Sequence, residues 1–151
     1  MNTGIRPAMA GDIPALLPLV EQYWMFEDIA GFDAARVGRE LARVMADPAL
    51  ASAWIAIDTG RPVGYLLAVY VFSLEHLGLT AEIDEFFVPP SARGRRIGDA
   101  LLEQAEAEFV RRGCTHVALQ LGRGNDRARV FYRAHGYGER AGYDLLDKTL
   151  G

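Results

Sequence analysis

The chain has 151 residues, half of them apolar, so it can fold as one domain around a sizeable core but is too short for two full domains. Its formal net charge of -4 argues against a nucleic-acid-binding protein, which needs a broad basic surface, and suits a cationic substrate better. We therefore expect a single domain over residues 1–151 with no nucleic-acid partner.

The sequence contains no pattern typical of a secretory signal, a membrane span or a zinc site. Met1 to Arg6 lack the basic stretch and following apolar run of a secretory signal, and no apolar run approaches the length of a membrane span. The single cysteine, Cys114, is expected to be a small buried hydrophobic side chain. One cysteine and three scattered histidines do not have the spacing of zinc ligands. The expectation is a cytoplasmic protein with no metal and no membrane partner.

The first half of the chain predicts helices followed by a β-hairpin. In chain order, the expected elements are a short strand around Ile5, a helix over residues 13–24 capped by Asp12, a helix from Asp33 to just before Asp47, and strands over residues 54–58 and 63–72. Pro18 removes one hydrogen bond inside the first helix, so a kink or an early break is expected there. The segment between the two strands, residues 58–61, is typical of a hairpin turn.

The second half predicts strands that alternate with helices. The expected elements are a strand over residues 81–88, an amphipathic helix from Gly94 to about Arg112, a strand over residues 116–121, a helix from Asn125 to Gly136, and a closing strand over residues 143–146. Pro89 and Pro90 end the first of these strands, since neither can donate to a sheet ladder. Hairpins first and strand–helix–strand units later predict a mixed α/β fold, in which helices cover a mixed sheet.

The junction between the strand over residues 81–88 and the next helix carries the strongest local signal. Its sequence is Arg93-Gly94-Arg95-Arg96-Ile97-Gly98, with three guanidinium groups and no Ser, Thr, Asp or Asn to cap the helix. The free amides and the positive dipole end of a helix N-terminus bind anions such as a pyrophosphate, and the two glycines allow close approach. A basic surface turn explains the same loop equally well. The spacing matches neither a P-loop nor a dinucleotide-binding fingerprint.

Two blocks of the sequence resemble the GNAT superfamily of N-acetyltransferases. The first block joins Asp84-Glu85-Phe86-Phe87-Val88 to the loop and resembles the family's acetyl-CoA signature, Gln/Arg-x-x-Gly-x-Gly/Ala. Arg93 and Gly98 match the first and last positions of that signature, whereas Arg96 replaces the middle glycine. The second block, residues 125–137, is similar to the family pattern Asn-x-x-Ala-x-x-Phe-Tyr-x-x-x-Gly-Phe/Tyr.

The resemblance spans nearly the whole chain, because residues 5–8 are also similar to the family's opening. It implies a GNAT fold, whose central mixed sheet is flanked by helices and splays between its two middle strands to admit acetyl-CoA. The end of the strand over residues 81–88 would pair with the pantetheine arm, and a backbone amide near Val88 would stabilise the oxyanion. The implied cofactor-binding residues are Phe86, Phe87, Val88, Arg93, Gly94, Arg95, Arg96, Ile97, Gly98, Asp99 and Asn125.

Tyr132 is the general acid that the resemblance implies. It occupies the family's tyrosine position, and an unperturbed phenol, with a pKa of about 10, can protonate a departing thiolate at neutral pH. From local sequence alone, a tyrosine beside Phe131 on a helix is more often a packing residue. Asn125 is expected to cap the same helix while it contacts the cofactor.

The residue that receives the proton of the acceptor amine is expected on the strand over residues 81–88. Glu82, Asp84 and Glu85 crowd this strand, and strict alternation predicts that Glu82 and Asp84 share one face while Glu85 points to the other. Asp84 is the first candidate, because many relatives place an acidic residue four positions before the valine that Val88 matches. Glu85 is the second. A solvated strand face remains the alternative for each of them.

Acetyl transfer from acetyl-CoA to a primary amine of a small molecule, by direct attack, is the function that the resemblance implies. The acceptor would be a diamine, a polyamine, an amino acid or similar. The sequence from Asp84 to Val88 is also similar to the Glu-Asp-Phe-Phe-Val string of spermidine/spermine N-acetyltransferases. A protein N-acetyltransferase and a non-catalytic acyl-CoA-binding sensor are the alternatives. Homodimer formation is left open.

Overall fold

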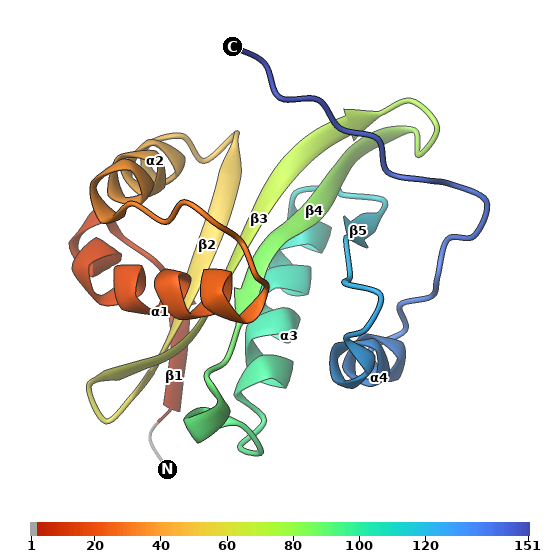
Figure 1. The fold of residues 1–151 in the computed structure, drawn as a ribbon. Helices are drawn as coiled ribbons and strands as arrows, with labels where there is room; N and C mark the ends of the chain where they lie inside the picture. Colours follow the sequence, from red (N-terminus) through yellow and green to blue (C-terminus); the bar gives the residue numbers. More distant parts are fainter. Residues whose placement is uncertain (1–2) are drawn as a thin grey trace. The chain divides into compact units, whose positions relative to one another are not determined.

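Five strands form one mixed sheet in residues 3–151, the part of the chain that the computed structural model describes (Figure 1). They are β1 (Thr3–Pro7), β2 (Ala51–Asp58), β3 (Arg61–Ser73), β4 (Gly78–Phe87) and β5 (Val117–Leu119), and they lie in this order across the sheet. The first four pair antiparallel with their neighbours, whereas β5 runs parallel to β4. The predicted mixed sheet is confirmed.

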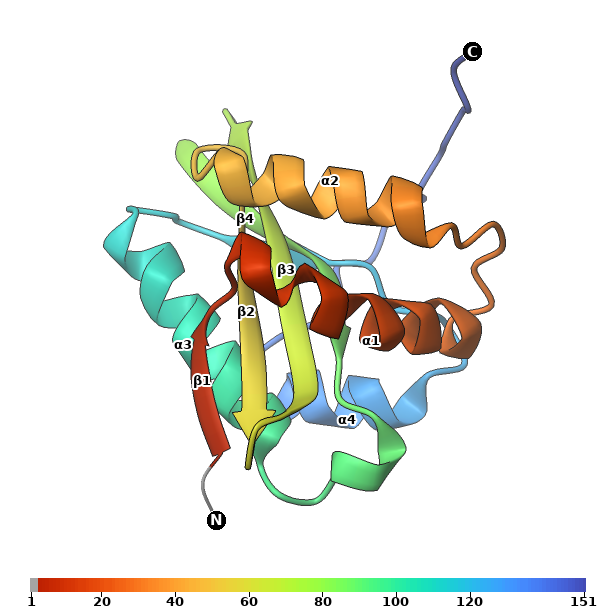
Figure 2. The ribbon, with the colours of Figure 1, turned by 90° about the vertical axis from the view of Figure 1, so that its left-hand side faces the viewer.

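Helices lie against both faces of this sheet. The helices are α1 (Ile13–Phe26), α2 (Ala34–Ala46), α3 (Ile97–Arg111) and α4 (Asp126–Ala134), with short 3-10 turns η1 (Ala10–Asp12) and η2 (Pro90–Ala92). Of these, α1 and α2 pack on one face of the sheet and α3 packs on the other (Figure 2). Within residues 3–151, no helix combines the length and the apolar character that a membrane crossing requires.

Consecutive residues of β2 point into two separate apolar cores. Ile55 is fully buried beneath α1 and α2, in a cluster that includes Tyr65 and Phe87. Trp54 lies beneath α3, where its ring meets Phe109 edge-to-face with the ring centroids 6.0 Å apart. Successive strand side chains point to opposite faces, so the apolar run of β2 is the pattern of a strand covered on both sides.

The described residues divide into two compact units, the first ending at Gln120 and the second formed by Leu121–Gly151. The sheet and α1 to α3 belong to the first unit, and α4 belongs to the second. As predicted, Asn125 caps α4, since its side chain accepts a hydrogen bond from the Ala128 amide, and Gly136 follows the helix with a φ of 88°. That the two units form one functional domain stays a prediction.

The early break expected as one effect of Pro18 does not occur, whereas a kink, the other, stays a prediction. α1 runs from Ile13 to Phe26 with Pro18 inside it. Leu16, Leu19 and Val20 are buried on either side of the proline, and their packing stabilises the helix against the one backbone bond that proline cannot make. Helix stability in a folded protein comes mainly from such tertiary packing.

Two local predictions are wrong. Asp12 stands just before α1 but does not cap it, because its carboxylate binds the Arg6 guanidinium and the Met9 amide instead. The closing strand over residues 143–146 is absent from the described chain, where this segment has no ladder partner and Leu146 is 90% exposed. Alternating apolar residues form a strand only where a sheet edge is available to pair with them.

Candidate active site

A β-bulge interrupts β4 at Asp84. In the register with β3, Glu85 lies opposite Leu67 and Ile83 lies opposite Ala68, which leaves Asp84 as an extra residue without a partner. A bulge inserts one residue into one strand and shifts the alternation of side chains beyond it. The bulge therefore changes the direction of the acidic side chains at this end of β4.

The acidic side chains of β4 consequently face differently from the prediction. Glu82 lies opposite Val69 and Glu85 lies opposite Leu67, two positions apart on β3, so Glu82 and Glu85 share the α1 face of the sheet. The expectation that Glu85 points to the face opposite Glu82 is therefore wrong. Strict alternation cannot hold across the extra residue at Asp84.

The carboxylate of Glu85 is held by two neutral donors. Trp24 on α1 donates its indole N–H to Oε2, and Tyr65 on β3 donates its hydroxyl to Oε1, each at 2.8 Å. Burial is the main effect that raises the pKa of Glu85, and the charge of Asp84 adds to it, while the two hydrogen bonds act in the opposite direction. Glu85 is thus fixed in place without a cation to neutralise it.

Asp84 adds a second carboxylate beside Glu85. Although Asp84 as a residue is exposed, its carboxyl group is partly withdrawn from water, which raises its pKa. In the described part of the chain neither carboxylate forms an ion pair. Desolvation, reinforced by nearby carboxylates, also raises the pKa of Tyr23 and Tyr65 well above the usual range, so both phenols stay protonated.

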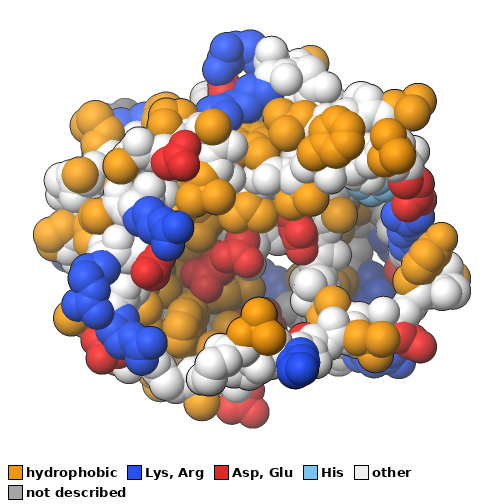
Figure 3. Space-filling view, turned by 90° about the horizontal axis from the view of Figure 1, so that it is seen from above, with side chains coloured by type: hydrophobic (Ala, Val, Ile, Leu, Met, Phe, Trp, Pro, Cys, Tyr) orange, Lys and Arg blue, Asp and Glu red, His pale blue; other side chains and the backbone are white. Residues whose placement is uncertain are grey.

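Aromatic side chains lie around these carboxylates. The ring of Tyr23 meets those of Tyr65 and Phe87 edge-to-face, with centroid distances of 6.4 Å and 5.8 Å, and Trp24 packs similarly on Phe32 at 5.6 Å. In the view of Figure 3, acidic side chains gather near the centre of the face with apolar side chains around them. Carboxylates without cationic partners, placed among aromatic rings, are a favourable environment for an organic ammonium ion.

Trp24 and Tyr65 were not predicted as site residues. Both fit the apolar pattern of their elements, the helix and the hairpin, and no motif marks them. A signal was nevertheless available, because tryptophan N–H and tyrosine O–H groups usually have a hydrogen-bond partner when they are buried. Sequence alone could not identify Glu85 as that partner, since the bulge decides which face Glu85 takes.

The acidic residues of β4 lie at and just beyond the end of its pairing with β5. The pairing between β4 and β5 covers only three positions and ends where Ile83 lies opposite Leu119. In the described residues no strand pairs with residues 84–87 on that side, whereas β3 pairs with β4 on the other. A free strand edge can receive an extended molecule as an additional strand. The pairing of β4 with β5 therefore ends just before Asp84, and the splay that would admit acetyl-CoA stays a prediction.

The loop that follows β4 presents an uncapped helix N-terminus. α3 begins at Ile97, and among the described residues no side chain caps it. Arg96 occupies the N-cap position in the left-handed conformation, with a φ of 59°, and Gly94 also has a positive φ of 80°. The position at which the GNAT signature has its middle glycine therefore has a backbone conformation that favours glycine.

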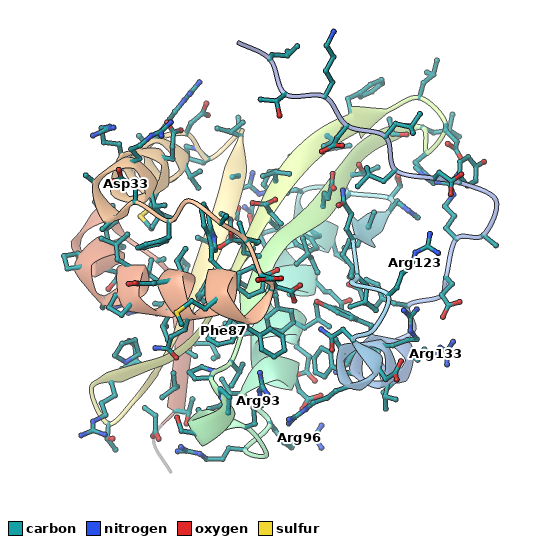
Figure 4. The ribbon with its side chains drawn as sticks, in the orientation of Figure 1. Asp33, Phe87, Arg93, Arg96, Arg123 and Arg133 are labelled. Carbon is teal, nitrogen blue, oxygen red and sulfur yellow. The ribbon has the colours of Figure 1, made fainter. Side chains whose placement is uncertain are left out.

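The arginines of this loop have different surroundings. Figure 4 shows Arg93 and Arg96 on the segment that leads from β4 to α3. Arg93 donates its Nε–H to the Val88 carbonyl at 2.9 Å, and its guanidinium lies over the Phe26 ring, 5.4 Å from the centroid. The Arg96 side chain is 82% exposed, with its Nε 3.8 Å from an Asp99 oxygen.

Arg95 binds Asp58, the last residue of β2. Its Nη1 donates to Asp58 Oδ2 at 2.7 Å, and its Nη2 donates to the Ser91 carbonyl at 3.3 Å. Arg93 and Arg95 are therefore both engaged in contacts that hold the loop. Of the three guanidinium groups, that of Arg96 is the one left largely in solvent.

Tyr132 lies on α4, in the second unit. Its ring packs edge-to-face against Phe131 and Tyr137, with centroid distances of 5.4 Å in both cases. Its carbonyl accepts hydrogen bonds from the amides of His135 and Tyr137, which close the C-terminal end of the helix. All of these contacts join residues within 131–137, so they depend on the local sequence alone.

The model of the Acetyltransferase (GNAT) family matches residues 16–137 and so extends over parts of both units. The uncharacterized N-acetyltransferase YhfO of Bacillus subtilis is 28% identical over 146 residues, 92% of each chain. Aminoalkylphosphonate N-acetyltransferase of Salmonella typhimurium is 34% identical over 83 residues, 55% of this chain and 54% of that protein. A predicted acetyltransferase of Clostridium acetobutylicum, solved with acetyl-CoA, superposes with a TM-score of 0.82 at 18% identity, covering 97% of this chain and 96% of the other.

Proposed function

The chain belongs to the GNAT acetyltransferase family, and we propose that it transfers the acetyl group of acetyl-CoA to the primary amine of a small cationic molecule. The acceptor class is a diamine, a polyamine, an amino acid or a similar compound. One observation carries this proposal: two carboxylates without ion-pair partners in the described residues, Asp84 and Glu85, lie among aromatic rings where the β4–β5 pairing has ended. The positive charge of an amine would compensate them.

The residues present fit acetyl-CoA, which supplies the activated acetyl group when bound. The N-terminus of α3 has no side-chain cap and is proposed to offer backbone N–H groups to the pyrophosphate, from residues 94–98. Gly94 and Gly98 have no Cβ atom, so they would allow the anion to approach closely, and Ile97 is the first residue of the helix. The backbone of Phe86, Phe87 and Val88, which lies beyond the end of the β4–β5 pairing, is proposed to pair with the pantetheine arm. Asp99 and Asn125, each at a helix start, would complete the cofactor site.

Asp84 is proposed to receive the proton of the attacking amine, directly or through water. An amine attacks only in its neutral form, and a carboxylate whose pKa is raised by desolvation holds a proton better than one in free solution. Glu85 has both oxygens occupied by Trp24 and Tyr65, so its role is to orient the cationic acceptor electrostatically. These two roles follow from the different surroundings of the two carboxylates.

Tyr132 is proposed as the general acid that protonates the departing thiolate of CoA. The observation behind this role is its position in the second family block, within the matched range of residues. A phenol is protonated at neutral pH and can give its proton to a thiolate as the carbon–sulfur bond breaks. This step is a proton transfer from the phenol to the sulfur and does not itself require a metal.

The test is a screen of amine acceptors in which thiol release from acetyl-CoA is followed. We expect turnover with diamines and other small cations, and much weaker turnover with an aminoalkylphosphonate, whose phosphonate the two carboxylates would repel. Turnover confined to peptides would replace the proposal with a protein N-acetyltransferase. Tight acetyl-CoA binding without turnover of any acceptor would indicate an acyl-CoA sensor.

A further inference from the structure

Asp58 lies apart from the acidic residues of β4, yet it contacts the cofactor loop. It is the last residue of β2, and only 8% of its surface is exposed. Its Oδ2 accepts the 2.7 Å hydrogen bond from Arg95, a residue 37 positions away in the sequence. Neither its sequence position nor the family pattern marks Asp58 as a site residue.

We propose that Asp58 is a positioning residue for acetyl-CoA: through Arg95 it holds the loop over residues 93–98 in the conformation that presents its backbone amides to the pyrophosphate. This inference rests on the proposed function, because it takes that loop as the cofactor site. Asp58 acts through Arg95 and does not itself contact the substrate.

The loop needs such an anchor because its backbone conformation is costly. Gly94 and Arg96 both have positive φ values, and the second of these is unfavourable for a residue with a Cβ atom. Arg93 secures the beginning of the loop through the Val88 carbonyl. Arg95 secures its middle, since its guanidinium joins the Asp58 carboxylate and the Ser91 carbonyl.

The Asp58–Arg95 pair is strong enough to act as an anchor because it is partly buried. The Asp58 side chain is 11% exposed and the Arg95 side chain 35% exposed. The other oxygen, Oδ1, is buried and has no hydrogen-bond partner in the described residues, so Arg95 is the group that compensates the charge of Asp58. Removal of Arg95 leaves the Asp58 carboxylate without a counter-charge where little water reaches it. Removal of Asp58 takes away the partner that holds the guanidinium of Arg95 in place.

Calorimetric titration with CoA and acetyl-CoA tests this inference in Asp58→Asn. We expect Kd to rise about tenfold or more, equal to about 1.4 kcal/mol or more of binding free energy, while the KM of the acceptor stays unchanged. Asp12→Asn is the matched control, because it breaks an ion pair of the same 2.7 Å length with similar exposure, 43% for Arg6 and 14% for Asp12. Its Kd should stay near that of the wild type.

A double-mutant cycle with Arg95→Gln tests whether Asp58 acts through Arg95. If it does, adding Asp58→Asn to Arg95→Gln should cause little further loss of affinity. The comparison of Arg95→Gln with the double variant can still be made if the single Asp58→Asn variant does not fold. Asp58→Glu, which keeps the charge, should retain part of the affinity. Wild-type Kd in folded Asp58→Asn, or losses that multiply in the double variant, would overturn the inference.

Gly98→Val separates failure of this inference from failure of the proposed site. Weak CoA binding in Gly98→Val with normal binding in Asp58→Asn removes only the positioning role. Normal binding in both variants shows that the loop is not the cofactor site, and the inference then falls with the proposal on which it rests.

Discussion

Arg96→Gly should make the protein more stable, although it removes a charged side chain. Arg96 has a φ of 59°, a left-handed conformation that costs an L-residue about 1–2 kcal/mol. Glycine avoids this cost but loses about 0.5–1 kcal/mol through the greater freedom of the unfolded chain. The weak contact with Asp99, 3.8 Å away on an 82% exposed side chain, contributes at most a few tenths of a kcal/mol. The net expectation is about 0.5–1 kcal/mol of added stability.

Urea denaturation of Arg96→Gly measures this gain, and Arg39→Gly provides the control. Arg39 is exposed within α2, where the backbone is right-handed, so the same chemical change there should destabilise the protein by about 1 kcal/mol. The two substitutions must therefore shift the midpoint in opposite directions. A loss of stability in Arg96→Gly similar to that in Arg39→Gly would refute the argument from backbone strain.

Acetyl-CoA binding by Arg96→Gly answers a separate question about the loop. If the pyrophosphate is held by backbone amides, the variant should bind acetyl-CoA about as tightly as the wild type, because glycine keeps the amide and its conformation. If the exposed guanidinium contacts a phosphate, Kd should rise at least about tenfold, since charge-assisted bonds contribute about 1.5–3 kcal/mol.

Three further predictions concern the reacting groups and their support. Asp84→Asn should lower kcat/KM by roughly 10²-fold near neutral pH and by much less at alkaline pH, because there the amine is already neutral in solution. A defect that does not change with pH would indicate a binding role instead. Tyr132→Phe should reduce turnover by about 10²–10⁴-fold while the affinity for acetyl-CoA stays normal. The reduction should be smaller with an acyl donor whose thiol is more acidic. Turnover at the wild-type rate, under conditions in which chemistry limits the rate, would exclude Tyr132 as the acid. Trp24→Phe removes one donor to Glu85 and should raise the KM of a cationic acceptor about tenfold, with acetyl-CoA affinity as the unchanged reference.

The wild-type enzyme should also lose kcat/KM as the pH falls through the raised pKa of Asp84. Desolvation favours the protonated carboxyl, so protonation begins at a higher pH than for an ordinary aspartate, and a protonated Asp84 cannot accept a proton from the amine. The acidic limb of the pH profile should disappear in Asp84→Asn. Its persistence would assign that limb to another group.

The sequence predicted the elements well where local chemistry decides them. The hairpin between β2 and β3 turns at Thr59 and Gly60, both with positive φ, as a two-residue turn requires. Asn125 caps α4 through its side chain, as expected from its residue type, and α2 begins after Asp33, where a helix start was predicted. These features depend on residues within a few positions of one another.

Features that depend on tertiary pairing were missed. The bulge at Asp84 leaves no trace in residue type, because an extra residue in one strand is visible only against its partner strand. The contacts of Glu85 with Trp24 and of Asp58 with Arg95 join residues that are far apart in the sequence. The apolar pattern of residues 143–146 likewise does not indicate whether a partner strand lies beside them, and in the described structure this segment is not a strand.

Mass spectrometry of a small diamine incubated with acetyl-CoA and the wild-type enzyme tests the central claim most directly. The account predicts an N-acetylated amine and an equal amount of free CoA, with the rate strongly reduced in the folded Asp84→Asn variant at neutral pH. Acetyl-CoA that binds tightly but remains intact in the presence of every small cationic amine would contradict it.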